Sequence, residues 1–69
     1  MFSVSDKYVG KKIKITFDDN SQCIAHCSGI TQKHDSGEKY NSISFEVEGE
    51  PNEYYGATED EIINIEILD

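Results

Sequence analysis

Four side chains of this chain have the chemistry of soft metal ligands or of a nucleophile with its base. They are Cys23, His26, Cys27 and His34, spaced Cys-x2-His-Cys-x6-His. On an extended strand Cys23 and Cys27 share a face, but their Cα atoms lie ~13 Å apart because a strand rises about 3.3 Å per residue. One zinc ion binds sulfur at about 2.3 Å, and a disulfide joins Cα atoms within about 7 Å. We therefore expect no metal site, no cofactor and two small core thiols.

A cysteine nucleophile also needs a base within hydrogen-bond reach. Neighbouring residues of a strand point to opposite faces, so His26 does not reach the thiol of Cys27. The sequence has no Gly-x-Ser-x-Gly elbow and no glycine-rich phosphate loop. A chain of 69 residues also leaves little room for a sheltered pocket. We expect that the protein is not an enzyme.

Alternation of apolar and polar residues predicts the strands that position these side chains. Five stretches show this period or are long enough for a short strand: residues 12–17, 22–32, 42–48, 53–57 and 62–68. Turn-forming residues separate them at 18–21 and 49–52. Gly29 interrupts the second stretch and predicts a bulge. Residues 33–39 have no apolar side chain and predict an exposed loop.

The same pattern predicts how these elements meet. In the last stretch three residues are expected to face inward: Ile63, Ile65 and Ile67. Short helical turns are expected at residues 4–8 and just before the last strand, where Thr58 and Glu61 have capping-box spacing. Closing a meander on itself removes its exposed edges. The sequence therefore predicts an all-β fold, with residues 1–69 forming a single small five-stranded barrel domain.

The charge is divided unevenly along the chain. Residues 1–34 carry five lysines against three acids, a net charge of +2, whereas residues 35–69 carry one lysine against eleven acids, a net charge of −10. Nucleic acids and anionic membranes are bound through Lys and Arg that neutralise phosphate, so neither is an expected ligand. Pairing of the first and last strands would place the outward Lys12 and Lys14 beside Asn64 and Glu66. The uncompensated acids would then lie over the third and fourth strands.

Two adjacent tyrosines accompany these acids. Tyr54 and Tyr55 cannot both face inward on a strand, so one is expected to be exposed. An exposed aromatic among carboxylates is a plausible anchor for a basic partner. A solvated negative face that only aids solubility remains the alternative. The predicted partner-binding face consists of Glu46, Glu48, Glu50, Glu53, Tyr54, Tyr55, Glu59, Asp60 and Glu61.

Three segments carry a family resemblance: YVGKKIKITF at 8–17, EDEI at 59–62 and IEIL at 65–68. They resemble Sm-like and SH3-like barrel domains of small bacterial proteins. The resemblance implies a five-stranded barrel with a short helical turn at the N-terminus and another before the last strand, and self-association through edge strands. The base-pocket residues of RNA-binding Sm proteins are not matched, since Asp35 and Asn41 lie six residues apart. The Arg-Gly or Lys-Gly of that family is replaced by Glu66 after Ile65.

We therefore expect a non-enzymatic protein-interaction module that contacts a basic protein through its acidic face. No apolar run approaches the roughly 20 residues of a membrane span, and the first residues lack a signal-peptide pattern. Secreted domains of this size usually carry more than two cysteines, so the expected compartment is the cytoplasm. The alternatives are a DNA mimic or inhibitor of the phage or mobile-element type and, after it, an Sm-like RNA-binding protein.

Overall fold

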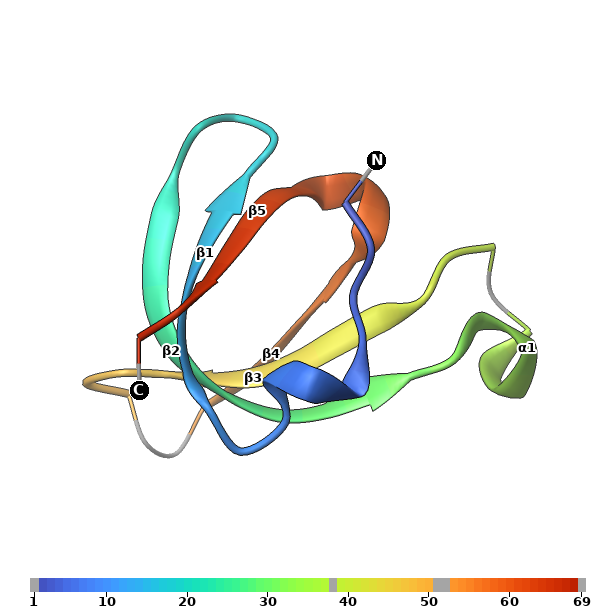
Figure 1. Cartoon of the computed structure of the whole chain (residues 1–69), viewed down its shortest axis with the longest axis horizontal. Helices are drawn as coiled ribbons and strands as arrows, with labels where there is room; N and C mark the ends of the chain where they lie inside the picture. Colours follow the sequence, from blue (N-terminus) through green and yellow to red (C-terminus); the bar gives the residue numbers. More distant parts are fainter. Residues whose placement is uncertain (1, 38, 51–52, 69) are drawn as a thin grey trace.

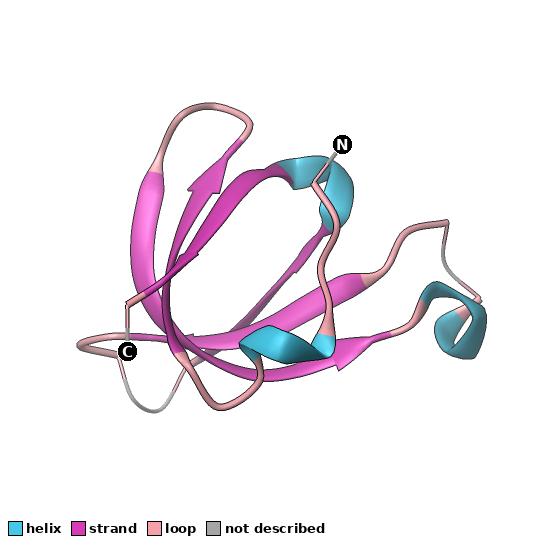
Figure 2. Cartoon of the chain, in the orientation of Figure 1, coloured by secondary structure: helices cyan, strands magenta, loops and turns pink. Residues whose placement is uncertain are grey.

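The computed structural model describes residues 2–37, 39–50 and 53–68, apart from the side chains of residues 35 and 36. It is an all-β fold built on one antiparallel sheet (Figures 1 and 2), with the strand order β4-β3-β2-β1-β5. The elements are η1 (Asp6–Tyr8), β1 (Lys12–Phe17), β2 (Gln22–Thr31), α1 (Lys33–Ser36), β3 (Ser42–Val47), β4 (Tyr54–Thr58), η2 (Glu59–Glu61) and β5 (Ile62–Ile67). The two 3-10 turns, η1 and η2, lie where helical turns were predicted. No helix in these ranges is long and apolar enough to cross a membrane.

The predicted barrel is not closed. β4 pairs with β3 alone and β5 pairs with β1 alone, so the described part of each strand keeps a free edge. The chain passes from β4 to β5 through η2. β5 then takes its backbone partners from β1, at the opposite edge of the sheet from β4. The sheet is strongly curved, but it remains open between its two edge strands (Figure 1).

The curvature depends on the long strand β2. Its first half pairs with β1 from Gln22 to His26, and its second half pairs with β3 from Ala25 to Thr31. The register with β3 shifts between Cys27 and Gly29, which confirms the bulge predicted at this glycine. A bulge bends its strand and increases the local twist. The bent β2 therefore wraps β1 and β3 around a common core.

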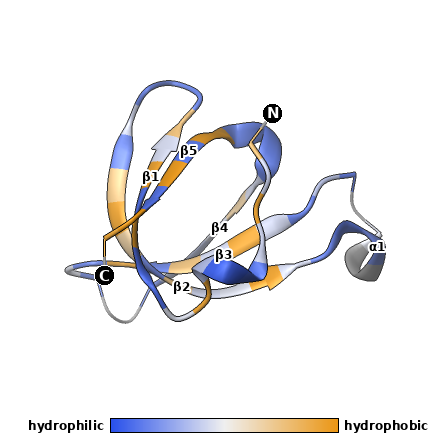
Figure 3. Ribbon diagram, in the orientation of Figure 1, coloured by the Kyte–Doolittle hydropathy of each residue, from blue (hydrophilic) through white to orange (hydrophobic). Residues whose placement is uncertain are grey.

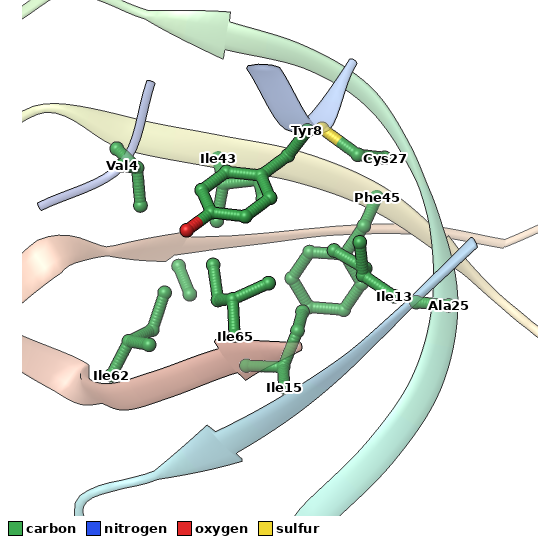
Figure 4. Close-up of a cluster of buried hydrophobic side chains, with 11 residues drawn as sticks. Val4, Tyr8, Ile13, Ile15, Ala25, Cys27, Ile43, Phe45, Ile62 and Ile65 are labelled. Atoms are coloured by element: carbon green, nitrogen blue, oxygen red, sulfur yellow. The ribbon is translucent and has the colours of Figure 1, made fainter. Parts of the chain in front are cut away.

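The core is a single apolar cluster that receives side chains from all five strands and from the N-terminal segment (Figure 4). Three isoleucines are the largest fully buried side chains: Ile13, Ile15 and Ile43. Burying an isoleucine contributes about 1.5–3 kcal/mol, so these residues are a major source of stability. Figure 4 shows the Tyr8 ring pointing into the same cluster as Val4 and Ile65. The N-terminal segment is thus part of the core.

The last strand differs from its predicted orientation. The register between β1 and β5 shifts so that Phe17 pairs with Ile62 while Thr16 pairs with Asn64. Ile63 falls in this irregularity and is 51% exposed, whereas Ile62 and Ile65 are buried. The expected inward position of Ile63 is therefore wrong, because a strict alternation does not survive a shift in register. Ile67 was also expected to be buried, but it is 40% exposed because it lies at the end of the edge strand.

The predicted loop at 33–39 also needs correction, because residues 33–36 form the helical turn α1. The side-chain oxygen of Asn41 accepts a hydrogen bond from the backbone N–H of Lys33 at 2.8 Å. Gly37 ends the turn with φ +75°, a conformation that costs glycine little. The absence of apolar side chains indicated exposure, but a single exposed turn does not require an apolar face.

Candidate protein-interaction site

Two lysine–glutamate ion pairs compensate part of the negative charge on the outer surface of the sheet. Lys14 forms an ion pair with Glu66 at 3.8 Å, as the predicted strand pairing required. Lys12 was expected beside the last strand as well, but its ion pair is with Glu48 at 3.5 Å, and Asn64 lies opposite Thr16. Both pairs are exposed and each contributes about 0–1 kcal/mol to stability. Their main consequence is that the charge of Glu48, one of the predicted partner-binding residues, is already compensated by a lysine.

The start of β4 presents the most exposed large apolar side chain of the described residues. Tyr54 is 70% exposed and lies opposite Glu46 of β3, so both occupy the outer face of the sheet. Glu46 in turn lies opposite His26 of β2. The expectation that one of the two adjacent tyrosines is exposed is met by Tyr54, and Tyr55 is 41% exposed as well.

Tyr55 lies on the opposite face of β4 from Tyr54, and both its ring and its hydroxyl group make contacts. Its ring stacks on Phe45 with centroids 6.1 Å apart, and its hydroxyl donates a hydrogen bond to the Glu50 carboxylate at 3.1 Å. That hydrogen bond, the charge of Glu50 and the charge of Glu53 raise the pKa of the Tyr55 phenol above its ordinary value. Glu50 and Glu53 therefore both act on this phenol. We call the residues gathered at this end of β4, on both of its faces, the Tyr54 surface; they are Glu46, Glu50, Glu53, Tyr54 and Tyr55.

Asp60 and Glu61 lie at the opposite end of β4. They belong to η2, which begins after Thr58, about 13 Å along the strand from Tyr54 at 3.3 Å per residue. Glu61 accepts hydrogen bonds from the backbone N–H and the hydroxyl of Thr58, each at 3.0 Å, and Asp60 also accepts from that hydroxyl. These bonds include the predicted capping-box contact. Asp60 and Glu61 are exposed, but they are not continuous with the Tyr54 surface.

Glu59 is buried, contrary to its predicted place on an exposed face. Only 8% of the residue is exposed. One carboxylate oxygen accepts from the backbone N–H of Val4 at 2.9 Å and lies 3.5 Å from the Asn41 side-chain nitrogen, and the other accepts from the Asn41 backbone N–H at 3.2 Å. A buried carboxylate persists where donors replace the water it loses. Glu59 therefore joins η2 to the N-terminal segment and to the residue before β3.

The nine residues predicted as one acidic face thus separate into four groups. The groups are the Tyr54 surface; Glu48, paired with Lys12; the exposed Asp60 and Glu61; and the buried Glu59. Only the Tyr54 surface combines exposed aromatic area with several carboxylates.

The cysteines and histidines are not brought together. Cys23 and Cys27 are free thiols, and burial raises the pKa of both. A raised pKa lowers the thiolate fraction and hence the reactivity. His26 is exposed on the outer face of β2. Across the described ranges, no group of three or more His, Cys, Asp or Glu residues is arranged to hold a metal ion.

One feature near η2 was not predicted. An open pocket of about 490 Å³ is lined by Phe2, Asp60, Ile62 and Ile63. The sequence contained one signal for it, because adjacent Ile62 and Ile63 cannot both face inward on a strand. The strict alternation along this stretch instead favoured an inward Ile63. We call these four residues the Phe2–Ile63 pocket.

Comparison of the chain with protein-family models, with curated proteins and with solved structures finds no match.

Proposed function

We propose that this chain is a non-enzymatic protein-interaction module whose Tyr54 surface binds a basic region of another protein. The observation that carries the proposal is the 70% exposure of Tyr54, which lies opposite the carboxylate of Glu46. Tyrosines are enriched among the residues that dominate binding energy, because they combine a large apolar ring with a hydroxyl group. Leaving such a ring in water is unfavourable, and a partner that covers it gains that free energy.

The electrostatics of the Tyr54 surface favour a cationic partner. Glu46, Glu50 and Glu53 form no ion pair with any lysine in the described ranges. Charge of one sign attracts an oppositely charged surface and speeds its association. Tyr55 supports the site from the inner face, because its stacking on Phe45 and its bond to Glu50 hold the strand and the preceding turn together.

The strand order and the 3-10 turn before β5 support the resemblance to SH3-like and Sm-like domains, which we include in this proposal. A DNA mimic needs carboxylates in an ordered row. The division of the exposed acids between the two ends of β4 gives that alternative no specific support.

The test measures the affinity of a purified binding partner for the full chain at low and high ionic strength. The partner is first isolated by capture on the wild-type chain. We expect the affinity to fall as salt is added, because exposed charges are screened beyond about 10 Å at 0.1 M salt. Tyr54→Ala should weaken binding at least about tenfold, as for a central aromatic anchor. Leu68→Ala, an exposed apolar residue beyond β5, is the matched control. Affinity that is independent of salt and of Tyr54 would refute the proposal.

A second candidate function is self-association through the edge strands, and a specific observation favours it. Among the described residues, β4 and β5 each pair on one side only, which leaves backbone donors and acceptors available to another strand. Sedimentation of the full chain over a range of concentrations tests this candidate. A mass that stays monomeric at the highest concentration would exclude it.

A further inference from the structure

We propose that the Phe2–Ile63 pocket is a second docking site, which receives a segment of a partner protein carrying an apolar side chain next to Lys or Arg. The pocket lies by η2, at the opposite end of β4 from the Tyr54 surface. The inference therefore goes beyond the proposed function and does not depend on it.

Three of the four residues that line the pocket are apolar. Phe2, Ile62 and Ile63 contribute hydrocarbon walls to an open pocket of about 490 Å³. Binding pockets for small ligands usually span about 300–1,000 Å³, so the space suits a bulky side chain with its neighbouring backbone. Phe2 is itself anchored, since its ring lies 6.2 Å from that of the buried Tyr8.

The exposure of Ile63 follows from the backbone. The register shift between β1 and β5 takes Ile63 out of the core, and the side chain stays 51% exposed. Isolated exposed apolar residues are ordinary on protein surfaces. Here the exposed isoleucine forms one wall of a hollow together with a second apolar side chain, Phe2. A partner side chain placed there would remove both from water.

The side chains around the pocket are acidic, which favours a positively charged partner. Asp60 is part of the lining, and Glu61 follows it. The backbone N–H of Asp18 donates to the carbonyl of Glu61 at 2.9 Å, which places the acidic β1–β2 turn beside η2. Figure 3 shows both segments as hydrophilic, against the apolar start of β5. In the part of the chain described here, no lysine forms an ion pair with Asp18, Asp60 or Glu61.

A cationic residue next to the apolar side chain is therefore the complementary arrangement. A second copy of this chain is a poor occupant, because its net charge of −8 would repel the acidic rim. The occupant that fits the pocket is therefore a basic and apolar segment of a different protein.

The experiment screens a random-peptide display library against the immobilised full chain at low ionic strength and measures the affinity of the synthesised peptides. Ile63→Ser removes one wall of the pocket. Ile67→Ser is the matched control, since it changes the same residue type on the same strand at similar exposure. Asp60→Asn tests the charge of the rim, with Glu53→Gln as its control. Thermal unfolding of each variant checks that the fold is retained.

We expect enriched peptides in which an apolar residue adjoins Lys or Arg. Their dissociation constant should rise at least about tenfold for Ile63→Ser, the loss expected for an apolar anchor. Asp60→Asn should produce a smaller rise and a weaker dependence on salt, while the two controls and Tyr54→Ala change nothing. The inference is overturned if no peptide is enriched, if the peptides lack basic residues, or if Ile63→Ser and Ile67→Ser bind them equally. Self-association that Ile63→Ser abolishes would also overturn it, because the occupant would then be a second copy.

Discussion

The two ends of β4 use glutamate in opposite ways. At the η2 end, the carboxylate of Glu59 is buried and accepts hydrogen bonds from backbone groups. At the other end, the exposed carboxylate of Glu50 accepts a hydrogen bond from the hydroxyl of Tyr55. Backbone donors that are cut off from water depend on a protein acceptor, whereas an exposed hydroxyl can exchange its partner for water. The first carboxylate therefore supports the fold, and the second stays available for a partner.

The surroundings of each carboxylate decide its role. Glu59 bonds Val4, which lies 55 residues away in the sequence, and Asn41, which lies 18 residues away. Asn41 in turn accepts from the N–H of Lys33 at the start of α1. One side chain thus links the N-terminal segment and the chain before β3 to the connection between β4 and β5.

The largest expected effect is at Glu59. Glu59→Ala should lower the free energy of unfolding by about 2–4 kcal/mol, because it leaves the N–H groups of Val4 and Asn41 without their acceptor. Glu59→Gln should cost less, since the amide oxygen can still accept one of these bonds. Urea unfolding measures both, with the exposed Glu53→Ala as the control. Equal stability of Glu59→Ala and Glu53→Ala would remove the contrast between the two ends of β4.

An intermediate effect is expected at the capping box of η2. Thr58→Ala removes the hydroxyl that bonds Glu61 and Asp60, and loss of such a cap costs about 0.5–2 kcal/mol. The backbone N–H of Thr58 keeps its bond to Glu61, which limits the loss. The shift in the urea midpoint is the measurement. A cost above that of Glu59→Ala would show that the cap, rather than the buried carboxylate, holds this end of β4.

The smallest effect on stability is expected at Glu50, where the readout is a pKa. Glu50→Ala removes the hydrogen bond and the nearby charge that raise the pKa of Tyr55, so the phenol should titrate at lower pH. Because the raised pKa reflects a protonated form favoured by folding, its contribution is complete below the ordinary pKa near 10 and is lost as the pH rises through the folded-state pKa. Ultraviolet titration of tyrosinate follows the change.

The controls for this titration are Glu53→Gln and Tyr55→Phe. Glu53 acts on the phenol through its charge alone, so its substitution should lower the pKa less than Glu50→Ala does. Tyr55→Phe identifies the signal by removing the late-titrating phenol. An unchanged pKa in Glu50→Ala would mean that Glu50 does not hold Tyr55 in solution.

Much of the fold was predictable from the sequence. The boundaries of β1 agree with the prediction, those of β2, β3 and β4 differ by one residue, and the Gly29 bulge and the turn before β5 were both expected. Two adjacent tyrosines on one strand predicted that one of them is exposed, but not which one, and the structure exposes Tyr54 to 70% and Tyr55 to 41%. Closure of the barrel was not predicted correctly. It depends on whether the two edge strands meet, and alternation within each strand contains no information on that contact.

The candidate sites were only partly predictable. Composition indicated an acidic surface and two adjacent tyrosines, which correspond to the Tyr54 surface. It did not separate Glu59 from Asp60, because the pattern Thr58-Glu59-Asp60-Glu61 predicts a capped turn without showing which of its acids faces the core. Nor did alternation along the last strand reveal the register shift that exposes Ile63.

The sequence by itself determined the strands, the turns and the sites of bending, because these depend on residues that are neighbours in the chain. Which acids are buried, paired or exposed depends on the tertiary contacts. Glu59 is part of the interior because the backbone N–H groups of Val4 and Asn41 donate hydrogen bonds to its carboxylate. The negative charge of Glu48 is compensated by an ion pair with Lys12. These outcomes arise from contacts between distant segments, where the desolvation of a charge is balanced by donors that local sequence does not specify.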